Sequence, residues 1–110
     1  MNNIGGYVYL ICDPGQDVYK IGVTRNIKSN RIKKLQTGNA SELHMITYVY
    51  YTYPFRLETL LHRHFINKLA YGEWFYLETD DVLNFKKICQ EKIDLIELMK
   101  DNIFFNKNLK

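Results

Sequence analysis

The sequence predicts an α+β domain in which a small antiparallel three-stranded sheet is flanked by helices. Segments 7–12 and 17–23 are rich in β-branched and aromatic residues, which is typical of strands. Asp13-Pro14-Gly15-Gln16 lies between them, and its Pro and Gly favour the second and third positions of a β-turn. The two strands therefore form an antiparallel hairpin, and helical patterns follow it along the chain.

The remaining elements follow in the order β-β-α-β-α-(β)-α. A first helix is expected over residues 27–36, after a cap at Thr24 or Asn26. A third strand covers 45–53, and Pro54 suits the first turn of a second helix because its missing N–H has no helical partner there. Residues 73–77 read as a short strand or turn. A long third helix then starts after a cap at Thr79 or Asp80.

Length and composition limit the class of protein. A chain of 110 residues with 46% hydrophobic residues is large enough for one core, so 1–110 is expected to be a single domain. No apolar run approaches the ~20 residues that cross a bilayer, and the first residues do not resemble a signal peptide. Cys12 and Cys89 fit neither a disulfide framework nor a zinc motif. We expect an intracellular protein without a membrane partner.

Charge is distributed unevenly along the chain. Residues 1–70 contain nine Lys or Arg and four acidic residues, whereas 71–110 contain six lysines and eight acidic residues. The window 20–34 has six basic residues and no acidic one. Such a window indicates a polyanionic partner, most often nucleic acid, although a solvated helix face would give the same pattern.

Arg31 and Glu58 lie where a purely structural account favours apolar residues. Ile27, Arg31 and Leu35 are spaced i, i+4 and i+8, so Arg31 projects from the stripe that faces the protein. Glu58 borders the buried stripe of the second helix, with His62 one turn further along the same side. The ordinary explanations are an arginine stem covering the core edge and a surface Glu–His pair. The functional explanation for Glu58 is a carboxylate that holds a divalent cation.

Lys20 lies in the middle of the second strand. If the hairpin closes symmetrically around 13–16, Lys20 is directly opposite Tyr9 and points to the same face. A neighbouring ammonium favours the phenolate, which would help Tyr9 act as a base. The ordinary explanation is an edge-strand lysine that discourages aggregation. Together with Arg31 and Glu58, this set of residues suits hydrolysis of a phosphodiester with one metal ion.

In these residues the chain resembles the GIY-YIG endonuclease superfamily, in particular its phage and large-virus branch, named after a phage T5 open reading frame. The resemblance covers about residues 5–77. It is carried by six short segments in the same order as in the family: Gly6-Tyr7-Val8-Tyr9-Leu10-Ile11, Tyr19-Lys20-Ile21-Gly22, Arg31 with Leu35, Thr37-Gly38-Asn39, Glu58 to Phe65, and Gly72-Glu73-Trp74-Phe75.

The resemblance implies a metal-dependent DNA endonuclease or nickase with a GIY-YIG-like core over 5–77, a C-terminal helix over 78–101 and a tail over 102–110. Tyr9 would activate water, Arg31 would stabilise the scissile phosphate, and Glu58 would ligate a single Mg²⁺ or Mn²⁺. Candidate residues are therefore Tyr9, Lys20, Arg31 and Glu58 for catalysis, Tyr19 and His62 for catalytic support, and Arg25, Lys28, Lys33 and Lys34 for DNA contact.

Some features depart from the family pattern. Lys20 stands where the second tyrosine of the name-giving motif is usual, as in some restriction-type members. The late asparagine of some homing-type members has no clear counterpart, although Asn84 is a candidate. Many relatives carry a separate DNA-reading domain that these residues do not include, so a homodimer or a partner protein would supply specificity. The alternatives are a non-catalytic DNA-binding module of the same fold and a protein-interaction domain that keeps only the fold.

Overall fold

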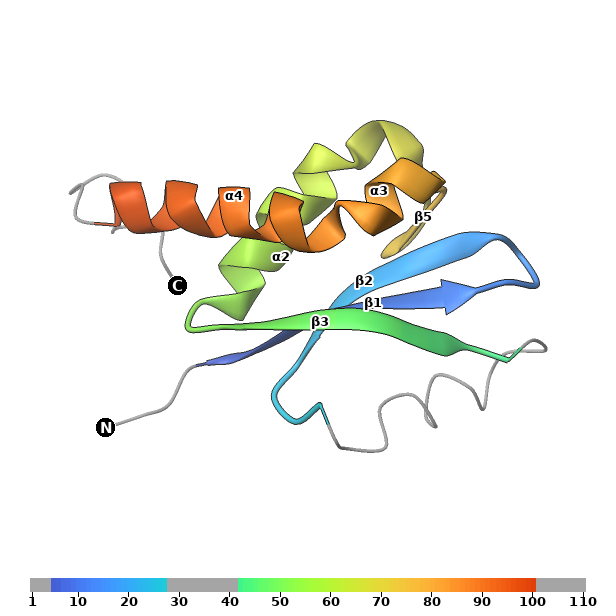
Figure 1. The fold of residues 1–110 in the computed structure, drawn as a ribbon, viewed down its shortest axis with the longest axis horizontal. Coiled ribbons are helices and arrows are strands. Elements are labelled where there is room, and N and C mark those ends of the chain that lie inside the picture. The colour runs from blue at the N-terminus through green and yellow to red at the C-terminus, as the bar shows by residue number, and fades with distance from the viewer. Residues whose placement is uncertain (1–4, 28–41, 101–110) are drawn as a thin grey trace.

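A computed structural model describes residues 5–27 and 42–100 of the chain. One antiparallel sheet, ordered β3-β1-β2-β5-β4, forms its base (Figure 1). The elements are β1 (Gly6–Asp13), β2 (Val18–Thr24), β3 (His44–Tyr51), α2 (Pro54–His64), the 3-10 helix η1 (Ile66–Lys68), β4 (Leu69–Tyr71), β5 (Trp74–Phe75), α3 (Thr79–Leu83) and α4 (Phe85–Met99).

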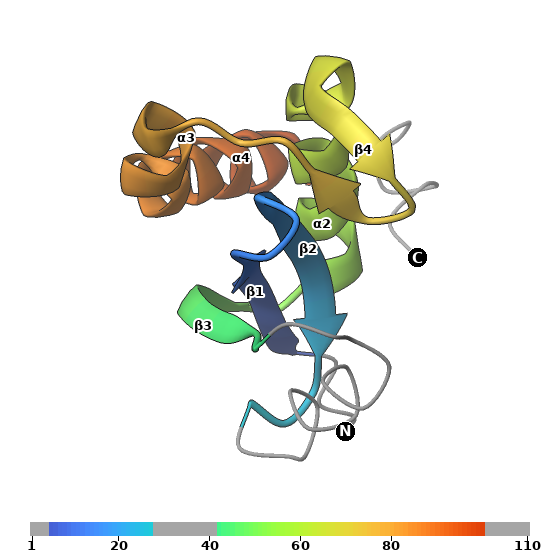
Figure 2. The same cartoon turned by 90° about the vertical axis from the view of Figure 1, so that its right-hand side faces the viewer.

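The α+β class and the three long strands are confirmed, and the sheet is larger than expected. The short strands β4 and β5 extend it beyond β2, because the turn between them lets Trp74 and Phe75 pair with Lys20 and Tyr19 (Figure 2). The helix expected over 27–36 and the tail over 102–110 lie outside the described residues.

The register of the β1–β2 hairpin differs from the expected one. The turn forms as predicted, with the Gln16 N–H donating to the Asp13 carbonyl at 3.2 Å and the Gly15 N–H donating to the Asp13 side chain at 3.1 Å. Asp17 then adopts a positive φ of 56° and lies in the loop, so Asp13 pairs with Val18. Four residues separate the strands, a common hairpin length. The predicted pairing of Tyr9 with Lys20 is therefore wrong.

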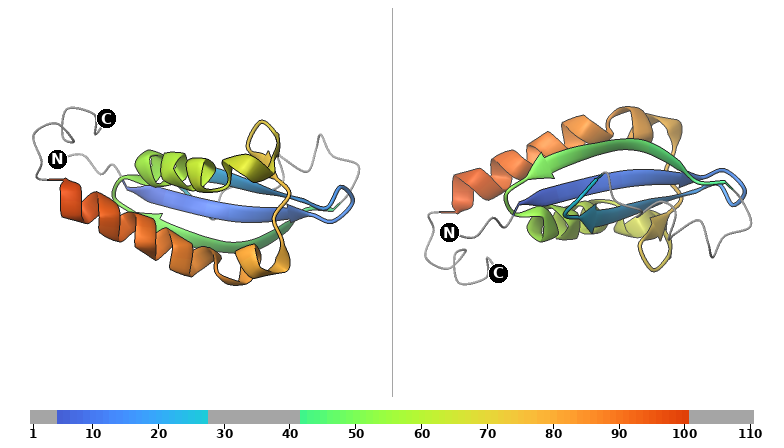
Figure 3. Two further views of the ribbon diagram at one scale, coloured as in Figure 1. Left: turned by 90° about the horizontal axis from the view of Figure 1, so that it is seen from above. Right: turned by 90° about the horizontal axis from the view of Figure 1, so that it is seen from below.

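The two faces of β1 are buried against different parts of the chain. Val8 and Leu10 face α2 and α4, which lie over one side of the sheet (Figure 3). Tyr9 and Ile11 point to the other side, where they pack with Leu43. The core beneath the helices consists of Val8, Leu10, Ile21, Tyr51, Leu57, Leu61, Phe65, Phe75, Leu77, Phe85, Cys89 and Ile96.

The predicted long third helix is two helices joined at Asn84. The Asn84 backbone N–H and its side-chain Nδ2 both donate to the Asp80 carbonyl, which closes α3 before α4 begins. The N-cap is Glu78 and not Thr79 or Asp80, because the Glu78 N–H donates to the Asp81 carboxylate at 2.8 Å. The Asn84 side chain therefore has a structural role at the junction of α3 and α4. None of the described helices is long and apolar enough to cross a membrane.

Gly22 lets the Tyr9 ring lie directly across β2. The two residues are cross-strand partners, and a Cβ at position 22 would overlap the Tyr9 hydroxyl and ring. Any side chain at this position would have to displace a ring that is fully buried. The close approach explains why the Lys20-Ile21-Gly22 segment ends in glycine.

Gly22→Ala is expected to lower the free energy of unfolding by about 1–3 kcal/mol through displacement of Tyr9. Urea-induced unfolding measures this change. Gly72→Ala is the matched control, because Gly72 has a positive φ of 55° but no atom near its missing Cβ. The control should cost about 1 kcal/mol from backbone strain alone. A Gly22→Ala cost no larger than that of the control would show that Tyr9 is not held against β2.

Candidate functional site

Lys20 is a nearly buried cation on β2. Its side chain is 11% exposed, and its Nζ lies 2.7 Å from Oε1 of Glu73. The ammonium also lies 5.8 Å from the centroid of the Trp74 ring. A buried ammonium is costly without an opposite charge, and the Glu73 carboxylate supplies that charge.

Glu73 is placed by a tight turn between β4 and β5. Gly72 supplies the positive φ that the turn needs, and the Ile21 N–H donates to the Glu73 carbonyl at 3.1 Å. On β2, β5 pairs only with Tyr19 and Lys20, and the next residue, Ile21, uses its N–H to hold the turn. This hydrogen bond fixes the Glu73 backbone to the edge of β2.

Glu58, the second acidic residue of the site, lies on α2 beside His62. His62 Nε2 lies 2.9 Å from the Ile21 carbonyl, which can only accept, so Nε2 carries the proton. The His62 ring also packs on Phe75, at 5.1 Å between centroids. Glu58, one turn earlier on the same side of α2, lies 3.9 Å from the same nitrogen through its Oε2. The predicted Glu58–His62 pair is present.

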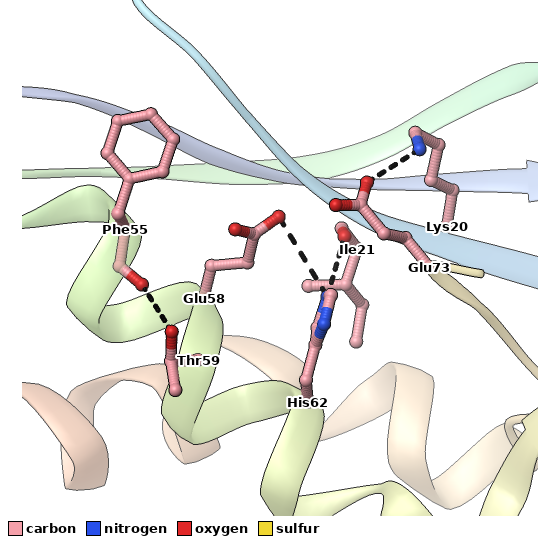
Figure 4. Close-up of polar contacts among 7 residues, drawn as sticks. All are labelled: Lys20, Ile21, Phe55, Glu58, Thr59, His62 and Glu73. Carbon is pink, nitrogen blue, oxygen red and sulfur yellow. Dashed lines mark hydrogen bonds and ion pairs between the residues drawn. The ribbon is translucent and has the colours of Figure 1, made fainter.

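The carboxylates of Glu58 and Glu73 point toward one another at this edge (Figure 4). The Glu58 side chain is 15% exposed, and burial raises its pKa, with the neighbouring Glu73 charge adding to the rise. His62 and Lys20 act in the opposite direction and favour the carboxylate. The site thus places two acidic groups around one ammonium.

Tyr9 approaches this edge from the other face of the sheet. It shares that face with Lys20, because the actual register differs from the expected one by two residues and so preserves the face. α2 packs on the opposite face, so Tyr9 and Glu58 can approach each other only around the edge of β2. The Tyr9 hydroxyl lies against Gly22, the residue that follows Ile21 on this strand.

The remaining predicted residues are distributed as follows. Tyr19 points to the helix-covered face, where it contacts Cys12, and burial raises its pKa. It does not join the cluster. Arg25 is exposed just after β2. The candidates that lie outside the described residues are Lys28, Arg31, Lys33 and Lys34.

Sequence reasoning did not assign a role to Glu73. The only signal available was its position in Gly72-Glu73-Trp74-Phe75, where a glycine turn places an acidic residue directly before two aromatic ones. Phe75 is buried in the core beneath the helices, whereas Trp74 packs on the Tyr9 side of the sheet.

The donor groups suit a hard divalent cation. Glu58 and Glu73 offer oxygen ligands from two like-charged groups that face each other, and Mg²⁺ is usually held by one or two carboxylates with water and phosphate completing its shell. Within the described residues no group of three or more His, Cys, Asp or Glu side chains is arranged to hold a metal ion.

Charged side chains of both signs thus gather at one edge of the sheet in this α+β domain. The sequence model of the T5orf172 domain matches residues 6–90, and the chain belongs to this family, in agreement with the resemblance of its motifs to the GIY-YIG-like phage endonucleases. The family indicates a nuclease-like or DNA-binding module. No curated protein and no solved structure matches the chain.

The raised pKa of Glu58 predicts a pH dependence of stability. The folded protein holds this proton more tightly than the unfolded chain does, so the free energy of unfolding falls as pH rises from the ordinary value of 4.5 through the raised pKa. Glu58→Gln should remove this fall and be more stable than the wild type at neutral pH without divalent cations. Urea unfolding across the acidic to neutral range measures it.

The control for this measurement is Glu78→Gln, because the Glu78 side chain is 79% exposed and pairs with Lys68 away from the site. This variant should keep the wild-type pH dependence. If Glu58→Gln were the less stable protein at neutral pH, burial of the Glu58 charge would not be a cost to the fold.

Proposed function

We propose that the chain is a metal-dependent DNA endonuclease or nickase that hydrolyses phosphodiester bonds with one Mg²⁺ or Mn²⁺. The observation that carries the proposal is the meeting of Lys20, Glu58 and Glu73 at one edge of β2. Membership of the T5orf172 family supports it, because the motif residues Tyr9, Lys20 and Glu58 are all present in the matched region.

Each residue has a distinct role in this proposal. Tyr9 takes a proton from the attacking water, which requires its buried hydroxyl to become accessible beside Gly22. Lys20 and Arg31 place positive charge on the scissile phosphate, where charge develops during hydrolysis. His62 holds α2 against β2 through the Ile21 carbonyl and thereby keeps Glu58 at the edge.

Glu58 is the proposed ligand of the cation. A bound Mg²⁺ or Mn²⁺ would supply Lewis-acid stabilisation of the phosphate and of the leaving oxygen. Burial and the Glu73 charge already disfavour the free Glu58 carboxylate, so a cation at this point would relieve an existing repulsion. Sequence specificity would come from a second copy of the chain or from a partner protein.

Glu58→Ala tests catalysis directly. Loss of the ligand should reduce nicking of supercoiled plasmid in Mg²⁺ or Mn²⁺ by at least about 100-fold, which corresponds to ~3 kcal/mol of transition-state stabilisation. DNA binding without metal should be unchanged or slightly tighter, because one like charge is removed. Glu78→Ala, the exposed acidic control, should cleave like the wild type. Wild-type cleavage by Glu58→Ala would assign the activity to another site.

A second candidate function is a DNA-binding module without catalysis. The observations that favour it are the complete burial of Tyr9 and the pairing of the Lys20 ammonium with Glu73. In this case phosphate contact would depend on the basic residues after β2, namely Arg25, Lys28, Lys33 and Lys34, with no requirement for Glu58. Absence of cleavage by the wild type in either metal would make this the better account.

Both candidates require DNA affinity that decreases with salt. Neutralising a phosphate of duplex DNA contributes about −0.9 to the slope of log affinity against log salt concentration. The double variant Lys33→Ala/Lys34→Ala should therefore make the slope shallower by about two units, measured by fluorescence anisotropy with a labelled duplex. Lys86→Ala/Lys87→Ala on α4 is the matched control and should leave the slope unchanged. Affinity that is indifferent to salt would exclude nucleic acid as the partner.

A further inference from the structure

We infer that Glu73 is a second carboxylate ligand of the catalytic cation, and that Lys20 occupies the position of this cation in the metal-free protein. The inference rests on the proposed function and adds to it a residue with no assigned role, together with an exchange of one cation for another. It is carried by the Lys20–Glu73 ion pair, by the facing carboxylates and by the hydrogen bonds that hold both segments to β2.

The segments that carry Glu58 and Glu73 are both held to β2 at one residue. Ile21 donates its N–H to the Glu73 carbonyl at 3.1 Å and accepts at its own carbonyl from His62 at 2.9 Å. The β4–β5 turn and α2 are therefore held to the same point of β2. The carboxylates of the two segments approach each other at this point, and a cation between them would offset their repulsion.

Lys20 supplies only part of the charge that this site can accept. Two carboxylates facing a single ammonium leave one negative charge in excess, and the ammonium bonds to Glu73 at 2.7 Å rather than to both groups. A divalent cation would match the charge of the two carboxylates and can take oxygen ligands from both. It would therefore compete with Lys20 for Glu73.

Displacement of Lys20 has a consequence for the substrate. Without Glu73 as its partner, the nearly buried ammonium is no longer neutralised, and a phosphate oxygen on the Tyr9 side of the sheet can take the place of the carboxylate. Lys20 would thus be neutralised in the resting protein and contact phosphate only when the cation is bound. This would link cation binding to phosphate binding.

The test measures Mn²⁺ binding to the full chain by electron paramagnetic resonance of the free ion, without DNA and without any assay of cleavage. Lys20→Met should bind Mn²⁺ several-fold more tightly than the wild type, because it removes the competing charge. In the Lys20→Met background, adding Glu73→Gln should weaken binding by about tenfold or more. Glu78→Gln in the same background is the matched control and should have no effect.

The Lys20→Met background separates two roles of Glu73. If Glu73 only neutralises Lys20, Glu73→Gln has no effect once the lysine is absent, and that result would overturn the inference. Glu73→Asp in this background retains a carboxylate and should keep most of the Mn²⁺ affinity, which controls for local unfolding. Circular dichroism of each variant provides the second control.

The outcomes also separate this inference from the proposed function. Loss of Mn²⁺ binding in Glu58→Gln, together with no effect of Glu73→Gln in the Lys20→Met background, would leave Glu58 as sole carboxylate ligand and reject only the inference. Absence of Mn²⁺ binding in both the wild type and Lys20→Met would reject the inference and the metal dependence together. Mn²⁺ binding by Lys20→Met but not by the wild type would support competition between Lys20 and the cation.

Discussion

The backbone of Ile21 is the constraint on which the rest of the site depends. At the point where β5 stops covering β2, a strand edge would ordinarily expose an unpaired N–H and C=O. Here the β4–β5 turn takes the N–H and His62 takes the C=O, so each of these backbone groups is satisfied by an element that also carries an acidic side chain. The contacts that satisfy the backbone hydrogen-bonding groups of the sheet edge therefore also bring the charged side chains together.

The charges of the cluster are interdependent in a similar way. Lys20 is nearly buried, and Glu73 supplies the opposite charge that stabilises its ammonium. Burial raises the pKa of Glu58, the Glu73 charge adds to this rise, and His62 and Lys20 partly offset it. No single member can be removed without changing the energetics of the others, so variants of these residues need a background in which the coupling is also removed.

The sequence predicts the strands, the turn and α2 well because their signals are local. β-branched alternation, a Pro-Gly turn and Pro54 at a helix start each act within a few residues. The register was wrong by two residues because Asp17 adopts a left-handed conformation that its identity does not dictate, yet an even shift kept Tyr9 and Lys20 on one face. Glu73 was missed because its role arises from distant contacts with β2 and α2, and a single turn residue carries no periodic signal. The prediction of one long C-terminal helix was wrong because Asn84, which lies inside the predicted span, caps the C-terminus of α3.

The buried Tyr9 ring shows how the fold and the proposed chemistry constrain each other. Packing across Gly22 gives the ring one position, and this position places the hydroxyl at the β2 edge rather than in the middle of the sheet face. α2 reaches the same edge from the opposite side because His62 is held by the Ile21 carbonyl. A tyrosine and a carboxylate from opposite faces of one sheet can act on one phosphate only at such an edge. Under the proposed function, the absence of a side chain at Gly22 and the short length of β5 would therefore serve the site as well as the fold, since a longer β5 would cover the edge of β2 beside Gly22.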